Sequence, residues 1–429
     1  MTDICFIYLP HPYLKRPDAQ LPMGILMLAA VIKQDGRYSV EVKNYSSFTM
    51  EQAIGDLPEA KIYGITATSM EIPYANEFAK GIKNKYRKSW VIIGGPCVQT
   101  EREYFNFHYV DGIIYGESEL DILDIIDVFL NDKKRLETYW FCETPIDMDS
   151  LPFPAREMLD QIGGDVFAYN KNYFPGGSTA ILSSRGCPFD CAFCSSPSLN
   201  HRWIRYRNPE NVVQEITHVI SEYGIKQFRF SDDMFTADRK RVFEICELIG
   251  PLDIAWRIST RVKPIDIDML QTMKDAGCKE ISFGVESFDN KVLKLLNKKT
   301  CLNDNIRALE LADKVGIDSR ILLMIGTPGQ TPRTIRLNKQ FIDLLPHTIV
   351  ACTSFVPLPG SDIWDNPDKY GIEILSRDMR DYNFYFFGAD GANELKSVIK
   401  LKDRLLDEFM AETQEFREWL FAREDVNKG

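Results

Sequence analysis

The chain has 429 residues and a formal net charge of −11, with 45% hydrophobic and 26% charged residues. This length suits about two or three domains with sizeable cores. The acidic balance argues against the broad basic surface that nucleic-acid binding requires, so we expect a small-molecule substrate. No stretch approaches the roughly 18 apolar residues of a membrane span, and no signal peptide is recognisable, so we expect no membrane association and a cytoplasmic protein.

Short apolar runs alternate with amphipathic stretches over the first 130 residues. The runs predict strands at 4–9, 38–42, 62–66, 90–95 and 112–116, and the amphipathic stretches predict helices at 24–34, 50–57, 72–86, 101–106 and 119–130. This alternation indicates right-handed βαβ units, and we predict a Rossmann-like, flavodoxin-like α/β domain with a parallel sheet over residues 1–135. Ligands of such sheets bind at the carboxyl ends of the strands.

Residues 136–177 are charged and contain several prolines, which is typical of a linker. Alternation then resumes, with strands predicted at 179–184, 227–231, 254–259, 280–285, 320–325 and 349–355 and helices at 209–222, 238–249, 265–275, 289–296, 303–315 and 331–343. Six such units predict an incomplete (β/α)6 TIM-like barrel over 178–360, with functional residues at the strand ends. Residues 361–429 are predicted to form a helical C-terminal extension, with its main helix at 393–423.

Three cysteines lie within eight positions directly after the first predicted barrel strand, in the sequence GCPFDCAFC (186–194). In a reducing compartment such a group favours a metal site over disulfides. Iron–sulfur clusters are held by cysteine thiolates, and three thiolates on a four-iron cluster leave one iron open to a small molecule. Structural zinc is the alternative, but zinc usually has four protein ligands, and the single downstream His201 is unusually spaced for a fourth.

The C-x3-C-x2-C spacing of Cys187, Cys191 and Cys194, with an aromatic residue before the last cysteine, resembles the radical S-adenosylmethionine (SAM) enzymes. The resemblance extends over 179–360. It implies that the three cysteines bind a [4Fe–4S] cluster and that the amino and carboxylate groups of SAM fill the open iron. It also implies reductive cleavage of SAM to a 5′-deoxyadenosyl radical, with an external one-electron reductant such as flavodoxin or ferredoxin.

The resemblance further implies a set of SAM-binding residues on the loop and the later strands. These are Phe193, Asp232, Asp233, Ser259, Arg261, Glu286 and Arg320. The two aspartates would accept hydrogen bonds from the SAM ammonium, although helix capping is an equal alternative. Arg261 would reach the carboxylate or ribose, or form a structural ion pair. Glu286 ends an apolar strand, where a carboxylate is costly unless it has a partner.

The N-terminal motifs PMGILMLAAVI (22–32), YGITATS (63–69), IGGPC (93–97) and YGESE (115–119) resemble the cobalamin-binding domain fused to many radical SAM enzymes. The loop positions implied to lie near cobalamin are Met23, Gly24, Thr66, Ser69, Gly94, Gly95, Gly116 and Glu117. This sequence differs from the pattern of cobalamin-binding domains in two respects. The D-x-H-x-x-G motif that supplies a lower cobalt ligand in other cobalamin proteins is absent, and Cys97 stands where the family often has histidine. A fold retained without its cofactor is the alternative.

The resemblance implies a cobalamin-dependent radical SAM methyltransferase that acts on an unactivated carbon of a small molecule. A radical SAM enzyme of the same architecture that catalyses dehydration, cyclisation, rearrangement or oxidation is the main alternative. A methylthiotransferase acting on tRNA is disfavoured, because the N-terminal region lacks a second cysteine cluster and the chain is acidic. A corrinoid- or metal-binding module without catalysis is the remaining alternative.

Overall fold

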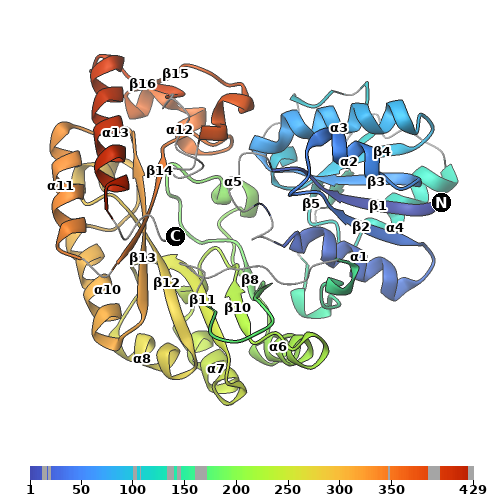
Figure 1. The fold of residues 1–429 in the computed structure, drawn as a ribbon, viewed down its shortest axis with the longest axis horizontal. Coiled ribbons are helices and arrows are strands. Elements are labelled where there is room, and N and C mark those ends of the chain that lie inside the picture. Colours follow the sequence, from blue (N-terminus) through green and yellow to red (C-terminus); the bar gives the residue numbers. More distant parts are fainter. Residues whose placement is uncertain are drawn as a thin grey trace. The chain divides into compact units, whose positions relative to one another are not determined.

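A computed structural model of the chain describes residues 1–11, 17, 21–99, 104–106, 108–132, 140–142, 146–159, 172–345, 348–384 and 397–423. The chain divides into two compact units, Met1–Ile162 and Gly163–Gly429, which are drawn in Figure 1. The finer boundaries at residues 135, 177 and 360 stay predictions. Across the described ranges, no helix combines the length and the apolar character that a membrane span needs.

A six-stranded parallel sheet organises the first unit. Its strands are β1 (Thr2–Tyr8), β2 (Val40–Asn44), β3 (Ala60–Thr66), β4 (Trp90–Gly94), β5 (Gly112–Gly116) and β6 (Trp140–Cys142), in the order β2-β1-β3-β4-β5-β6. The first five strands have the order of a flavodoxin-like sheet, as predicted. From β1 the chain adds β2 on one side of the sheet and then β3, β4 and β5 on the other side, so the strand order reverses between β1 and β3. The sixth strand was not predicted, because three residues inside a charged stretch carry no strand periodicity.

The helices of this unit are α1 (Met23–Asp35), α2 (Met50–Asp56), α3 (Ile72–Lys85) and α4 (Ile122–Asp127), the last continuing into a π-helical turn at Val128–Asp132. Local signals set their ends: Thr49 forms a capping box with Gln52 at the start of α2, and Gly36 adopts a left-handed conformation after α1. The helix predicted at 101–106 is not confirmed, since Tyr104 lies in a 3-10 turn, residues 105 and 106 are not helical, and the others lie outside the described residues.

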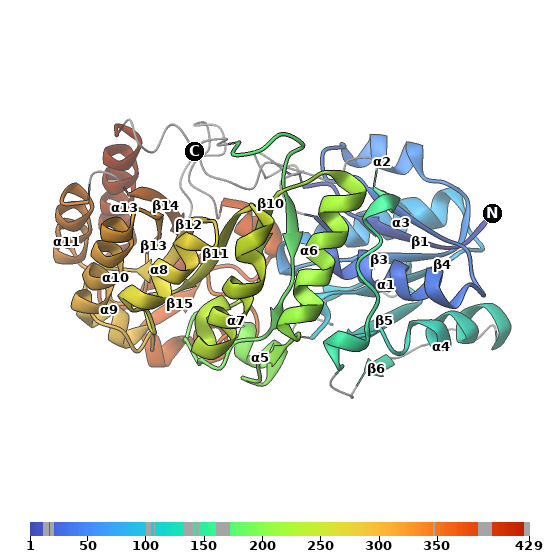
Figure 2. The same ribbon diagram turned by 90° about the horizontal axis from the view of Figure 1, so that it is seen from below.

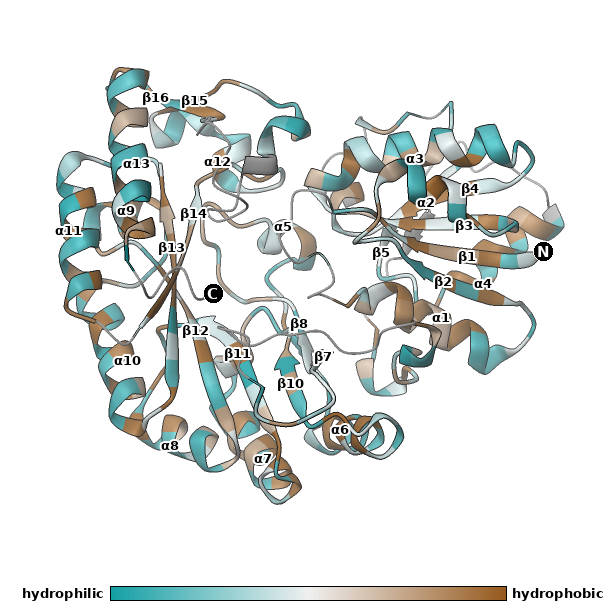
Figure 3. Ribbon diagram, in the orientation of Figure 1, coloured by the Kyte–Doolittle hydropathy of each residue, from teal (hydrophilic) through white to brown (hydrophobic). Residues whose placement is uncertain are grey.

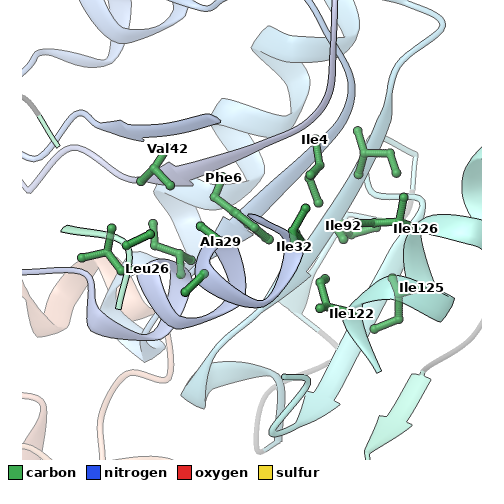
Figure 4. Close-up of a cluster of buried hydrophobic side chains, with 14 of the residues drawn as sticks. Ile4, Phe6, Leu26, Ala29, Ile32, Val42, Ile92, Ile122, Ile125 and Ile126 are labelled. Atoms are coloured by element: carbon green, nitrogen blue, oxygen red, sulfur yellow. The ribbon is translucent and has the colours of Figure 1, made fainter. Parts of the chain in front are cut away.

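One hydrophobic cluster of the first unit lies between α1, α4 and one face of the sheet, as Figure 4 shows. Ile4 and Phe6 from β1 and Ile92 from β4 pack against apolar residues of both helices. Ala155 and Leu159, from the stretch predicted to be a linker, also belong to this cluster. The Ala155 backbone N–H donates to the Leu26 carbonyl at 3.1 Å, so this part of the stretch is integral to the first unit.

A second parallel sheet of six strands forms the barrel of the second unit. Its strands are β7 (Thr179–Ile181), β10 (Gln227–Phe230), β11 (Ala255–Arg261), β12 (Cys278–Glu286), β13 (Asp318–Ile325) and β14 (Ile349–Ser354). Neighbours in the sheet follow chain order, with β7 and β14 at the two edges, which confirms the incomplete barrel.

Helices lie on the outside of this sheet, as Figures 1 and 2 show. They are α6 (Pro209–Tyr223), α7 (Arg239–Ile249), α8 (Ile267–Asp275), α9 (Asn290–Leu295), α10 (Leu302–Val315) and α11 (Pro332–Asp343). Their apolar faces cover fully buried strand residues such as Phe228, Ile258 and Ile321. The strand carboxyl ends are therefore left to the loops that carry the predicted site residues.

The C-terminal region differs from the prediction. It contains α12 (Asp362–Asp365), an antiparallel pair of β15 (Ile372–Ile374) and β16 (Ile399–Leu401), and α13 (Leu406–Phe421). The single helix predicted at 393–423 is wrong over its first part, because β16 pairs with β15 and buries Ile399 and Leu401. This long-range pairing overrides the local helical pattern.

Candidate active site

The cysteine loop leaves β7 and is framed by two short strands, β8 (Ser184–Arg185) and β9 (Arg205–Tyr206), which pair antiparallel. Gly186 has φ 92°, and a Cβ there would lie 2.0 Å from the Trp203 carbonyl oxygen, so only glycine fits. Within the loop, the Cys194 backbone N–H donates to the Cys191 carbonyl at 3.1 Å. A short helix, α5 (Ser196–Asn200), which was not predicted, follows the third cysteine.

Backbone hydrogen bonds anchor the cysteine loop to later parts of the barrel. The Ala192 N–H donates to the Leu296 carbonyl at 2.9 Å, and the Ala192 carbonyl accepts from the Ile363 N–H at 3.0 Å. Ser195 Oγ donates to the Pro359 carbonyl at 2.8 Å. The position of the thiols is thus set by segments that follow β12 and β14, more than a hundred residues along the chain.

The three thiols have the chemistry expected of cluster ligands. Burial raises the pKa of Cys194 to about 12 and also raises the pKa of Cys187, and the neighbouring thiols add to both shifts. Neutral thiols of this kind release protons when a metal binds, and soft sulfur donors suit iron–sulfur clusters. Among the described residues, no three metal-ligating side chains converge closely enough to hold a single metal ion.

His201 is the residue that the spacing offers as a fourth zinc ligand. His201 is exposed at the end of α5, and its ring lies 6.1 Å from that of Trp203. The donor set beside the loop therefore fits a three-cysteine cluster better than structural zinc.

Asp232 and Asp233, at the end of β10, have different surroundings. Asp232 is buried, and its carboxylate accepts hydrogen bonds from the Ser183 N–H at 2.8 Å and from the hydroxyls of Ser183 and Ser184. These bonds tie the end of β10 to the segment that follows β7. Neither aspartate caps a helix, because Asp238 is the N-cap of α7. The capping alternative is therefore wrong.

Asp233 is the aspartate that faces the cysteine loop. Its carboxylate is exposed and accepts from Ser196 Oγ at 3.0 Å. Desolvation by the surrounding protein raises the pKa of Asp233, and its charge in turn raises the pKa values of Cys187 and Cys194. Of the two aspartates, Asp233 keeps carboxylate oxygen available for an ammonium group.

Glu286 ends β12 in a strained conformation. Its φ is 63°, and the register with β13 shifts between Gly284 and Glu286. The carboxylate lies 2.7 Å from Lys298 Nζ, and both side chains are buried. Lys298 Nζ also lies 5.6 Å from the Phe193 ring, so it joins two predicted site residues. Lys298 was missed, because nothing in NKKT (297–300) distinguishes a buried lysine from exposed ones.

Arg261 contacts the cysteine loop itself. Its Nη1 donates to Cys191 Sγ at 2.9 Å, and its guanidinium lies 4.0 Å from the Phe189 ring. Its Nη2 donates to the Lys298 carbonyl. Among the described residues, Arg261 makes no ion pair with a carboxylate, and its contacts are with the cysteine loop and the segment after β12.

Ser259 and Arg320 lie deeper in the barrel than the other predicted residues. Ser259 is half-buried two residues before Arg261 on β11. Arg320 is the third residue of β13, in register with Ser282, and its Nε lies 3.8 Å from Glu280. The structure therefore does not bring Arg320 to the strand ends with the cysteine loop.

The residues predicted for cobalamin lie at one edge of the first sheet. Thr66, Gly94 and Gly116 end β3, β4 and β5, and Gly95 follows with φ 102°. A Cβ on Gly95 would lie 2.7 Å from the Ala67 carbonyl oxygen. Ser69 and Glu117 follow β3 and β5, while Met23 and Gly24 open α1.

A buried pair that the sequence did not indicate lies at the same edge. His11 follows β1, and its Nε2 contacts a carboxylate oxygen of Glu71, which follows β3. The ring of His11 lies 4.7 Å from that of Tyr8. The pair thus bridges the two strands between which the strand order reverses, where ligands of such sheets bind.

Residues 181–342 match the family model of the radical SAM superfamily. With the three-cysteine loop and the incomplete barrel, this match identifies a radical SAM domain. The chain combines this domain with an N-terminal Rossmann-like domain, as predicted, and radical SAM enzymes use a [4Fe–4S] cluster and SAM.

The chain is similar to several characterised and uncharacterised proteins. It is 28% identical over 389 residues to an uncharacterised methyltransferase of Pyrococcus horikoshii, covering 84% of this chain and 81% of the relative. It is 27% identical over 291 residues to the anaerobic magnesium-protoporphyrin IX monomethyl ester cyclase of Rubrivivax gelatinosus, covering 64% of this chain and 52% of the cyclase.

The fold is shared with a methyltransferase whose structure contains cobalamin. The radical SAM methyltransferase TsrM from Kitasatospora setae, solved with cobalamin and a [4Fe–4S] cluster bound, superimposes with a TM-score of 0.65 at 16% identity. The match covers 88% of this chain and 78% of that chain, so the likeness includes the N-terminal domain as well as the barrel.

Proposed function

We propose that this protein is a cobalamin-dependent radical SAM methyltransferase that acts on an unactivated carbon of a small molecule. The observation that carries the proposal is the presence in one chain of the three-cysteine loop on a radical SAM barrel and a flavodoxin-like sheet with small-residue loops at its carboxyl edge. The methyltransferase of P. horikoshii and the fold of TsrM support it.

The residues of the barrel have distinct roles in this proposal. Cys187, Cys191 and Cys194 hold the cluster, and Arg261 stabilises the Cys191 thiolate. Asp233 accepts hydrogen bonds from the SAM ammonium. When bound, the cluster and SAM supply a 5′-deoxyadenosyl radical, and cobalamin supplies a methyl group.

The carboxyl edge of the first sheet fits a large flat cofactor. Gly94 has its nearest neighbouring atoms 3.8 Å from a Cβ position, and Gly24 has none within 4 Å. Such positions let a flat ring approach the backbone closely. We place Met23, Thr66, Ser69, Gly116 and Glu117 around the same ligand.

A radical reaction without methyl transfer is the second candidate, and the similarity to the Rubrivivax cyclase favours it. In that case the barrel residues keep their roles. The first domain would then bind the substrate, or hold cobalamin for a role other than methyl transfer. Both candidates need a one-electron donor such as flavodoxin or ferredoxin and a reducing, cytoplasmic environment that keeps the thiols available.

Anaerobic reconstitution with iron, sulfide and hydroxocobalamin tests the proposal. After gel filtration, the protein should retain corrinoid, and with reductant and SAM it should form S-adenosylhomocysteine only when corrinoid is present. A preparation that cleaves SAM to 5′-deoxyadenosine but never retains corrinoid would contradict methyl transfer and leave the second candidate.

A further inference from the structure

Three arginines project from adjacent strands into the interior of the barrel. Arg229 of β10 is in register with Arg257 of β11, which is in register with Glu280 of β12. Arg320 of β13 lies one step further along, in register with Ser282. In-register residues of a parallel sheet point to the same face.

That face is the lumen of the barrel. The alternate residues on the same strands, such as Phe228, Ile258 and Ile281, are fully buried beneath the outer helices. Figure 3 shows hydrophilic residues along β10, β11 and β12. A closed TIM barrel fills its interior with branched apolar side chains, so a charged lumen calls for an explanation.

On this face, the positive charges of the described residues outnumber the negative charges. Glu280 is buried and lies 3.0 Å from Arg257 Nη1 and 3.8 Å from Arg320 Nε. Among the described residues, three guanidinium groups share this face with two carboxylates, those of Glu280 and its register partner Asp318. Arg257 is buried and Arg229 and Arg320 are partly buried, so an excess of positive charge here is costly unless an anion compensates it.

Arg229 is the least satisfied of the three. It makes no hydrogen bond or ion pair with any residue that the structure describes, and its Nε is buried without a partner. Burial and the nearby Arg320 lower the pKa of Arg229, and Glu280 opposes this shift only in part. The planar guanidinium group of arginine presents paired N–H donors, which suit the bidentate binding of a carboxylate or a phosphate.

Small polar residues continue the lumen toward the cysteine loop. Ser231, Ser259 and Ser282 lie one step above Arg229 and Arg257 and level with Arg320, and Arg257 Nη2 donates to Ser282 Oγ at 3.4 Å. Ser231 and Ser259 are only partly buried, whereas Ser282 is fully buried. From Arg257 to Arg261, at the end of β11, the strand rises about 13 Å.

We propose that Arg229, Arg257 and Arg320 bind an oxyanion of the substrate, either a carboxylate or a phosphate. Building on the proposed function, this makes the substrate an anionic small molecule. Its charged group lies in the lumen, and its reacting carbon lies toward the cysteine loop. The arginine layer thereby selects the substrate and orients it.

Anion titration of the full-length protein, reconstituted with its cluster, tests this inference. Inorganic phosphate and succinate are titrated at constant ionic strength, with chloride as the reference, and binding is measured by calorimetry. We expect binding of at least one of them, weakened about tenfold or more in Arg229→Met and in Arg320→Met. Tighter binding of phosphate indicates a phosphorylated substrate, and tighter binding of succinate indicates a carboxylate.

The matched control is Arg239→Met, since Arg239 is half-exposed on α7 and pairs with Asp266 outside the barrel. Equal affinity in the parent, the control and the lumen variants would overturn the inference, as would failure of both anions to bind. Arg229→Lys keeps the charge and serves if Arg229→Met does not fold, with reduced affinity again expected. Anion binding without corrinoid retention would keep this inference and reject methyl transfer.

Discussion

Lys298 and Glu286 show how one buried pair organises the end of a strand. Glu286 holds a left-handed conformation that costs energy, and its carboxylate contacts Lys298 Nζ at 2.7 Å. Lys298 also supplies the carbonyl that accepts from Arg261, which in turn contacts Cys191. A chain of contacts therefore connects the β12 end to a cluster ligand.

Replacing Lys298 tests this role at the residue scale. Lys298→Met leaves the Glu286 carboxylate buried without its partner, so we expect a loss of about 3–5 kcal/mol in the free energy of unfolding. Urea denaturation of the cluster-free protein at neutral pH measures it. The control is Lys240→Met, because Lys240 is exposed on α7 and pairs only with Glu244, and this variant should change stability by less than about 0.5 kcal/mol. Equal effects of the two variants would contradict the structural role.

At the scale of elements, the start of α1 and the ends of β3, β4 and β5 present small residues at one edge of the first sheet. The chain needs glycine at Gly95, where a side chain would meet the Ala67 backbone. It does not need glycine at Gly24, which is exposed on α1 with no atoms within 4 Å of a Cβ position. A glycine that the fold does not require is a good position at which to test for a ligand.

Gly24→Leu and Gly55→Leu form a matched pair for this test. Both glycines are exposed in helices with open space around them, so both substitutions should leave stability unchanged or raise it by up to about 1 kcal/mol. Gly55 lies on α2, outside the positions assigned to cobalamin. We expect Gly24→Leu to reduce corrinoid retention after gel filtration several-fold and Gly55→Leu to retain it fully. If both variants retain corrinoid equally, Gly24 does not contact the cofactor.

The whole molecule consists of two compact units, each with its own parallel sheet. The cluster loop and the arginine layer belong entirely to the second unit, whereas the glycine-rich edge belongs to the first. The two proposed cofactors should therefore stabilise different parts of the chain, because a ligand stabilises the state to which it binds.

Hydrogen exchange measured by mass spectrometry separates these effects. Cluster and SAM should slow exchange in residues 183–200, 230–236 and 284–300, while hydroxocobalamin should slow exchange in residues 63–71, 93–99 and 115–119. Protection of the second set by cluster and SAM alone, without corrinoid, would contradict independent sites.

The sequence by itself determined both parallel sheets and the cluster loop. Alternating apolar runs and helical periodicity are local signals, and nearly every strand and helix of the two sheets follows from them. The spacing of Cys187, Cys191 and Cys194 is also local, since one loop carries all three thiols. The positions of Asp233 and Glu286 at strand ends followed from the same periodicity.

Only the tertiary structure decided which side chains meet. Lys298 pairs with Glu286, Asp232 is held by Ser183 and Ser184, and Arg261 turns to Cys191, through contacts between segments far apart in the chain. The arginine layer and the β16 strand have the same origin, because strand order and register create them. Local periodicity specifies where a strand runs, but the neighbours of a side chain depend on which distant strands pair with it.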